Sequence, residues 1–172
     1  GTALLASRVM QTCEGSDAVI VGLGGGFKYE YEVDIYSRAQ PLINEAVEKT
    51  TSQARVVCIT ALGTGNHFKC LDHLGKIYGK YFLWHGLAHK HLQEDMVREL
   101  KNWVVVRPCR LTDDPAKDKW YAAEDAFAGY PSMPAADVAQ FVVKECLPPE
   151  SSWLHRNVAV IPKYRGEPYM VH

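Results

Sequence analysis

The sequence lacks a long apolar run: no stretch approaches the ~20 residues that a membrane-spanning helix needs, and no signal-peptide pattern opens it. It also lacks net charge, because 19 lysines and arginines stand against 20 aspartates and glutamates. This balance argues against nucleic acid, or an anionic membrane, bound through bulk electrostatics. The 47% of hydrophobic residues excludes disorder and fibrous structure. We therefore expect one globular domain, residues 1–172, whose partner is a small molecule.

Paired cysteines are also missing. The five cysteines are odd in number, widely spaced and never arranged as C-x-x-C. This pattern favours reduced thiols in a cytoplasmic protein over a disulfide framework. Five of the seven histidines lie between residues 67 and 91, but no H-E-x-x-H or zinc-finger spacing accompanies them. We therefore predict no metal site.

Short β-branched runs alternate with longer amphipathic stretches along the chain. The runs predict strands at 17–21, 55–60, 103–106 and 157–161. The amphipathic stretches predict helices at 3–14, 34–49, 87–101 and 133–146. Gly15 should end the first helix, and Pro41 should kink or restart the second. Residues 66–86 show no clear period and predict an irregular excursion over a site.

Alternating strands and helices are typical of an α/β protein. The predicted strands are apolar on both faces, as in a parallel sheet with helices on both faces. In such sheets ligands bind beyond the carboxyl ends of the strands, which here are segments 22–26, 60–65 and 107–112. Glycine after a strand is often only turn chemistry. Because three strand ends agree, we favour a nucleotide-sized pocket.

The first strand end does not form a dinucleotide-binding fingerprint. The motif G-x-G-x-x-G would need glycine at position 27, where the sequence has Phe27. The polar and aromatic residues 28–32 do not predict a helix N-terminus that would bind a pyrophosphate. We therefore reject a pyrophosphate-binding turn at this position.

Four segments carry a family resemblance: DAVIVGLG from residue 17, ARVVCITALGTG from 54, WVVVRPCRLTD from 103 and MPAADVAQFVVKECL from 133. Together they resemble the later part of an atypical short-chain dehydrogenase/reductase, closest to the NmrA-like and flavin- or biliverdin-reductase-like NAD(P)H-binding proteins. The most specific pair is VVVRPCRLTDDP followed by PAADVAQFV. The resemblance covers residues 1 to about 162. It implies a Rossmann-like fold, of which this chain forms the C-terminal two-thirds, and NADP or NAD as cofactor.

The resemblance also implies site residues. The position of Lys90 often bonds the nicotinamide ribose in this family. The other expected cofactor contacts lie at the strand ends: Gly22, Leu23, Gly24, Thr60, Ala61, Pro108, Cys109, Arg110 and Leu111. Plainer interpretations make Lys90 a solvated helix charge, Cys109 a buried small apolar residue and Arg110 an exposed ion-pair partner.

Two family features are altered in the catalytic part. Ala61 stands where the family often has serine, so Thr60 or Thr64 would have to supply the hydroxyl. The usual Tyr-x-x-x-Lys pair is also missing, since Gly86 lies four residues before Lys90. A histidine beside that lysine can act as an acid near neutral pH. The catalytic candidates are Lys90, Thr60 and His91.

The family's first strand, its G-x-x-G-x-x-G turn and two further βα units have no counterpart in this sequence. In the family these parts hold the pyrophosphate and adenosine, so cofactor binding by residues 1–172 alone is not implied. Strand 17–21 would also form a bare apolar edge, which is an aggregation liability. We expect a missing N-terminal segment or another chain to cover that edge.

The leading functional hypothesis is an NAD(P)H-dependent oxidoreductase that acts on a small organic substrate. Segments 67–81 and 117–130 would form its substrate lid, with four aromatic side chains available for stacking: Trp120, Tyr121, Phe127 and Tyr130. One alternative is a non-catalytic, NAD(P)-sensing regulator of the NmrA-like type, which Ala61 and the missing tyrosine favour. The other is a cofactor-independent isomerase or cyclase.

Overall fold

The computed structural model describes residues 6–24, 34–126 and 132–163. Its main sheet has five strands in the order β1-β2-β3-β7-β5, with bounds Ala18–Val21, Arg55–Ile59, Trp103–Pro108, Asn157–Pro162 and Trp120–Ala123. Strands β1, β2, β3 and β7 run parallel, and β5 runs antiparallel to β7. The predicted α/β class is confirmed, with one antiparallel strand added to a parallel sheet.

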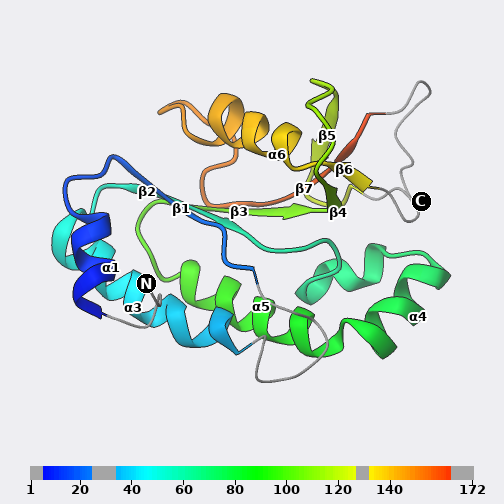
Figure 1. Ribbon diagram of the computed structural model, residues 1–172, viewed down its shortest axis with the longest axis horizontal. Helices are drawn as coiled ribbons and strands as arrows, with labels where there is room; N and C mark the ends of the chain where they lie inside the picture. The colour runs from blue at the N-terminus through cyan, green and yellow to red at the C-terminus, as the bar shows by residue number, and fades with distance from the viewer. Residues whose placement is uncertain (1–5, 25–33, 127–131, 164–172) are drawn as a thin grey trace.

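Helices cover both faces of the sheet, as the sequence predicts (Figure 1). One face carries α1, α3 and α5, and the opposite face carries α6 with the π-helical turn η2. Their bounds are Ala6–Cys13, Ile35–Thr50, Trp84–Val97, Ala135–Phe141 and Val142–Cys146. Along β3, Val105 packs toward the first face, and Val104 and Val106 pack toward the second. A strand that is buried on both sides is therefore apolar at successive positions.

The sequence pattern does not predict three short strands. They are β5 and the two strands of a separate parallel pair, β4 (Arg110–Thr112) and β6 (Ser132–Pro134). Each has only three or four residues. All four residues of β5 are half-buried, so the strand has no alternation of apolar and polar positions that would reveal it.

The structure differs from two predicted helix features, a restart at Pro41 and the bounds of helix 87–101. Helix α3 runs through Pro41 without restarting. The core contacts of Ala39 and Ile43 on either side offset the hydrogen bond that proline removes. Helix α5 begins at Trp84 instead of residue 87 and ends at Val97.

Residues 66–86 are not irregular. They form most of the 3-10 helix η1 (Gly65–Cys70), all of α4 (His73–Phe82) and the start of α5. The sequence pattern hides α4 because its two glycines lower helix propensity. The helix begins where the Asp72 carboxylate accepts a hydrogen bond from the Gly75 N–H at 2.6 Å. At Gly79 a Cβ would lie 2.9 Å from the Phe68 ring, so glycine permits that packing.

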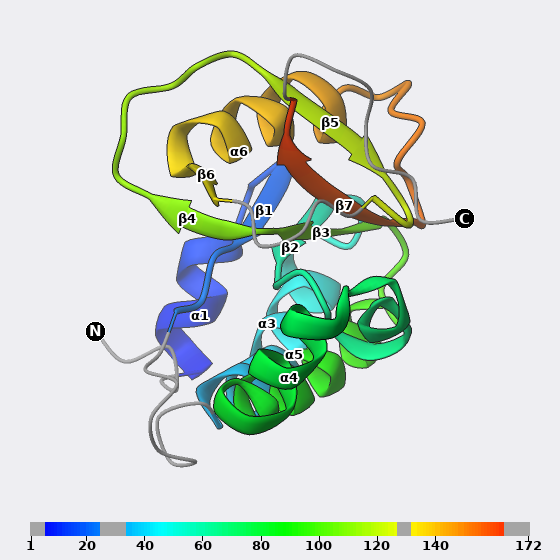
Figure 2. The same ribbon diagram turned by 90° about the vertical axis from the view of Figure 1, so that its right-hand side faces the viewer.

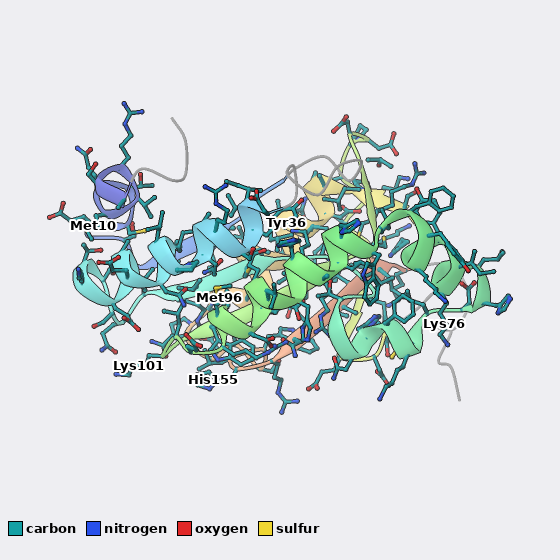
Figure 3. The ribbon with its side chains drawn as sticks, turned by 90° about the horizontal axis from the view of Figure 1, so that it is seen from below. Met10, Tyr36, Lys76, Met96, Lys101 and His155 are labelled. Atoms are coloured by element: carbon teal, nitrogen blue, oxygen red, sulfur yellow. The ribbon has the colours of Figure 1, made fainter. Side chains whose placement is uncertain are left out.

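A line of buried amides joins α3 to α5, which lie side by side in Figure 3. Gln93 Nε2 donates to Gln40 Oε1 at 3.0 Å, and Gln40 Nε2 donates to Asn44 Oδ1 at 2.9 Å. Asn44 Nδ2 then donates to the carbonyl oxygen of Met96 at 2.8 Å. These bonds set the register of the two helices that underlie the sheet.

A buried ion pair fastens α5 to the sheet. Glu94 on α5 is fully buried and accepts two hydrogen bonds from Arg107 on β3, from Nε at 3.0 Å and from Nη2 at 2.7 Å. The Thr60 hydroxyl, just after β2, donates to the same carboxylate at 2.7 Å, and Arg98 Nη2 donates at 2.9 Å. One carboxylate therefore joins α5, β3 and the end of β2.

Strand β1 lies at one edge of the sheet. Its register with β2 pairs Ile20 with Val57, and the Ile20 side chain is half exposed. Among the residues that the structure describes, no strand pairs with the outer side of β1. Within the same residues, no helix is long and apolar enough to cross a membrane.

Replacing Glu94 should test the ion pair. Glu94→Ala leaves Arg107 buried without its partner, and we expect the free energy of unfolding to fall by about 3–5 kcal/mol. The measurement is urea denaturation followed by circular dichroism. The neighbouring Asp95→Ala, which removes a half-exposed carboxylate, is the control and should cost less than about 1 kcal/mol. Equal effects of the two substitutions would contradict the assignment.

Candidate functional site

A cavity of about 500 Å³ lies beyond the carboxyl ends of β2 and β3. One part of its wall consists of residues expected at the site: Thr60, Ala61, Lys90, Pro108, Cys109, Arg110 and Leu111. The rest of the wall is mostly apolar and comes from the segment after β2, from α4 and from α5: Leu62, Leu71, Gly75, Tyr78, Gly79, Leu83 and Leu87. The expected positions at the ends of β2 and β3 thus meet at one cavity, whereas those at the end of β1 do not line it.

Backbone hydrogen bonds hold the two strand ends together. The Thr60 N–H donates to the Val106 carbonyl and the Leu62 N–H to the Pro108 carbonyl, both at 2.8 Å. The chain then turns away at Gly63, with φ +87°, and at Gly65, with φ +57°. Glycine adopts this left-handed conformation at little cost, which explains why the strand breaks where the sequence predicts.

Lys90 reaches from α5 to the cavity wall and is 4% exposed. Its Nζ donates to the carbonyl oxygens of Ile59 at 3.3 Å and Leu23 at 3.4 Å, and it lies 4.0 Å from the centre of the Tyr36 ring. Burial lowers the pKa of the Lys90 ammonium, while Cys58 and Glu94 act in the opposite direction. Lys90 therefore connects the ends of β1 and β2 and is not a solvated helix charge.

The end of β1 adjoins the cavity only through Lys90. Leu23 supplies a carbonyl oxygen to that lysine, whereas Gly22 and Gly24 are exposed. Neither glycine has a left-handed φ, and a Cβ on either would meet nothing within 4 Å. The turn geometry expected of them is therefore absent, and open space lies beside their backbone. Residues 25 and 26 of the same loop lie outside the described residues.

The Thr60 hydroxyl donates its hydrogen bond within the protein. It gives its proton to Glu94 Oε1 at 2.7 Å, so it cannot give the same proton to a ligand. Thr64 donates to the Ala61 carbonyl at 2.8 Å and is fully buried. Thr60 can still accept a hydrogen bond. Neither hydroxyl is placed to replace the family's serine as a proton donor.

His91 lies outside the cavity wall, although Lys90 precedes it directly. Its side chain is half exposed, and its Nε2 lies 3.8 Å from the Asp95 carboxylate. On its other side, a Cβ on Gly65 would lie 2.9 Å from its Nδ1. Of the three catalytic candidates, the structure brings Lys90 and Thr60 to the cavity and leaves His91 out.

The loop after β3 supplies the cavity with both buried and exposed groups. Cys109 is 6% exposed, and burial raises the pKa of its thiol to about 12. Pro108 is buried beside it, whereas Arg110 and Leu111 are exposed. An anionic ligand group would therefore meet Arg110 at the solvent side of the cavity wall.

Of the two predicted lid segments, only the first contributes described residues to the cavity wall. Residues 67–81 contribute Leu71 and three positions of α4. Trp120 instead packs against Phe141 on the opposite face of the sheet, with ring centroids 6.3 Å apart, and Tyr121 joins the same core. Phe127 and Tyr130 lie outside the described residues.

Sequence reasoning missed three residues that shape the site: Glu94, Tyr36 and His67. Glu94 follows Lys90 by four positions, and this spacing places both on one helix face, which is a signal that the sequence contains. Tyr36 reaches Lys90 through the packing of α3 on α5, so only the fold reveals it. The five cysteines are free, and in the described ranges no three His, Cys, Asp or Glu side chains gather as metal ligands.

His67 ties the loop after β2 to the loop after β5. It is 2% exposed, and its Nδ1 accepts the Gly63 N–H at 3.2 Å. Its Nε2 therefore carries the proton, which it donates to the Ala126 carbonyl at 3.1 Å. Burial, followed by the charge of Arg107, lowers the pKa of His67 to about 4. The imidazole is thus a neutral link in the cavity's support.

A family model described as NAD(P)H-binding matches residues 1–148. The chain belongs to this family. Among curated proteins, none matches the sequence.

Among solved structures, ChuY, an anaerobilin reductase from Escherichia coli, is similar at 20% identity with a TM-score of 0.73, over 98% of this chain and 75% of that one. A short-chain dehydrogenase/reductase from Veillonella parvula in complex with NADP matches at 13% identity and a TM-score of 0.67, over 93% and 69%. A Rossmann-fold NAD(P)-binding protein from Shigella flexneri matches at 15% and 0.63, over 99% and 74%. At these identities the likeness shows the Rossmann-like fold.

The low pKa of His67 makes stability depend on pH. The unfolded chain binds a proton at His67 below about pH 6.5, whereas the folded protein resists it until about pH 4. Stability should therefore fall by about 3 kcal/mol as the pH drops through this window. Denaturant titrations across the window measure the slope. His67→Gln, which keeps a donor and an acceptor without titrating, should flatten it. The exposed His85→Gln is the control, and an unchanged slope in His67→Gln would contradict this role.

Proposed function

We propose that this member of the NAD(P)H-binding family is an NAD(P)H-dependent oxidoreductase of the atypical short-chain dehydrogenase class that acts on a small, largely apolar organic substrate. Lys90 is the observation that carries the proposal. Its buried ammonium lies between the ends of β1 and β2 at the wall of the cavity. A buried titratable group with a shifted pKa in the wall of a cavity is typical of a functional site.

The described residues fit the nicotinamide end of NADP or NAD. Gly22 and Gly24 leave open space against the backbone, Lys90 offers a donor to ribose hydroxyls, and loop 108–111 lines the same cavity. When bound, the cofactor supplies a hydride. Leu62 and Leu87 then exclude water from the transfer, and the exposed Arg110 binds an anionic group of the substrate.

The side chains that could protonate a reduced substrate limit the class of substrate that suits the cavity. Ala61 offers no hydroxyl, and the proton of Thr60 is held by Glu94. The Lys90 ammonium, whose pKa burial lowers, and the Tyr78 phenol remain as acids in the cavity wall. Neither occupies the position of the family's serine, so acceptors that take their proton from solvent after reduction, such as flavins and quinones, suit this cavity better than simple ketones.

Ala61 in place of the family's serine, and the lack of a tyrosine four residues before Lys90, favour a second candidate function, an NAD(P)-sensing regulator of the NmrA-like type. Such a protein would bind the nucleotide without oxidising it in the presence of any acceptor. A cofactor-independent isomerase would bind neither nucleotide. Binding and turnover measured together therefore separate the three functions.

Removing the ammonium of Lys90 should weaken nucleotide binding. Charge-assisted hydrogen bonds contribute about 1.5–3 kcal/mol, so we expect Lys90→Met to raise the Kd for NADPH or NADH by roughly tenfold to a hundredfold. Fluorescence of the reduced nicotinamide measures Kd, and absorbance during addition of flavin or quinone measures oxidation. Lys117→Met, which removes an exposed lysine, is the control. Equal Kd values for the two variants, or no binding by a chain that also includes the family's N-terminal Gly-rich part, would contradict the proposal.

We also propose that another polypeptide segment, from the same protein or from another chain, covers the outer edge of β1. Ile20 is half exposed, and no strand of the described residues pairs with the outer side of β1. Both observations support this proposal, because such an edge is a template for a further strand.

A charge on this edge should oppose pairing. If the edge recruits a strand, the 172-residue chain should self-associate at micromolar concentration, and Ile20→Lys should return it to a monomer. Light scattering coupled to size exclusion gives the mass. Val143→Lys, on an exposed apolar residue of η2, is the control and should leave the mass unchanged. A monomeric parent chain whose β1 amides exchange freely would overturn the proposal.

A further inference from the structure

Helix α4 presents its apolar residues to solvent. Leu74, Ile77, Tyr78 and Tyr81 recur at the spacing i, i+3, i+4, i+7 and therefore form one stripe. Leu74 is 71% exposed and Tyr81 is 70% exposed. Such a stripe normally faces a core, but in α4 the residues that face the protein include Gly75 and Gly79. The helix thus packs inward through glycine and keeps its large side chains outside.

The stripe continues beyond the end of α4. Phe82 is 64% exposed and stacks on Tyr78 with ring centroids 5.1 Å apart, and Trp84 at the start of α5 is 58% exposed. The whole patch, termed the α4 surface, comprises Leu74, Ile77, Tyr78, Tyr81, Phe82 and Trp84. Figure 2 shows α4 at the end of the molecule nearest the viewer. Contiguous exposed apolar residues of this size mark an interaction site.

The charges around the α4 surface are mostly of one sign. Lys69 and Lys80 are exposed, and Lys76 is partly exposed at the outer side of the helix (Figure 3). Lys80 Nζ lies 5.5 Å from the centre of the Tyr81 ring. Asp72 is the only acidic residue between positions 64 and 93, and its carboxylate caps α4. A chain with a net charge of -1 therefore carries a local basic region beside its exposed aromatic residues.

This combination fits an anionic lipid surface better than a second copy of the chain. A two-fold contact through α4 would bring the same lysines toward each other with no acidic partner between them. At a bilayer, aromatic side chains lie at the level of the headgroups and lysines extend toward anionic lipids. The exposed aromatic residues of the α4 surface and the lysines beside them therefore favour an anionic lipid membrane as its partner.

We propose that the α4 surface docks on anionic lipid membranes. Leu74, Ile77 and Tyr81 enter the boundary between headgroups and acyl chains, and the lysines face the headgroups. The sequence-based expectation that the chain binds no membrane rested on the net charge of the whole chain. The lysines around α4 support the opposite for this surface. Because Gly75, Tyr78 and Gly79 of the same helix line the cavity, the docked face adjoins the candidate site.

Vesicle sedimentation tests the proposal with phosphatidylcholine alone and mixed with phosphatidylserine at about 2:1. We expect binding to the mixed vesicles, weaker binding to phosphatidylcholine, and loss of binding at high salt. The double variant Lys76→Glu/Lys80→Glu should lower the partition coefficient at least about tenfold. The matched control Lys117→Glu/Lys119→Glu, at exposed lysines distant in sequence from α4, should bind like the parent.

Trp84 provides an independent readout. Docking should shift the tryptophan fluorescence to shorter wavelength, and Trp84→Phe should still sediment with vesicles but lose that shift. Equal binding to both vesicle types, or equal binding by the two lysine double variants, would overturn the proposal. So would a dimer that Tyr81→Ser disperses while no variant binds vesicles, because the α4 surface would then be a contact between copies.

Discussion

The carboxylate of Glu94 is the constraint on which the geometry of the site depends. A fully buried charge must be matched, and Arg107, Arg98 and Thr60 all donate to it. These donors come from different elements. Their hydrogen bonds to one carboxylate therefore fix the position of α5 relative to β2 and β3. Lys90 lies one helical turn before Glu94 and therefore emerges at a fixed place beside the strand ends. An ion pair beneath the cavity thus determines where the cavity's own ammonium lies.

The parts predicted correctly from sequence are those that local pattern controls. Valine runs such as 104–106 indicate a strand covered on both faces, because alternate side chains pack into two different cores. Parallel strands carry their ligands at the carboxyl ends, so Thr60, Ala61 and the loop 108–111 could be placed at one cavity before the fold was known. The family resemblance added Lys90, which lies on a helix and has no strand-end signal.

The parts missed depend on contacts between distant segments. Adjacent residues of α5 face opposite environments, so Lys90 is buried and His91 is exposed, and the packing of α3 decides which is which. Asp137 accepts the backbone N–H groups of Lys117 and Asp118 at 2.8 and 2.9 Å, which organises the approach to β5 in a way that no local pattern reveals. Helix α4 was missed because Gly75 and Gly79 lower helix propensity, and the packing of Gly79 against Phe68 is visible only in the fold.

The Cys109 thiol in the cavity wall is protonated and therefore resists electrophiles and oxidants. Quinones and related acceptors are electrophiles that add to thiolates, and oxidants attack thiolates first. Burial raises the pKa of Cys109 to about 12, so its sulfur is a protonated thiol at neutral pH. Burial thus keeps the sulfur atom in the cavity wall in its protonated form, which reacts slowly with electrophiles and oxidants.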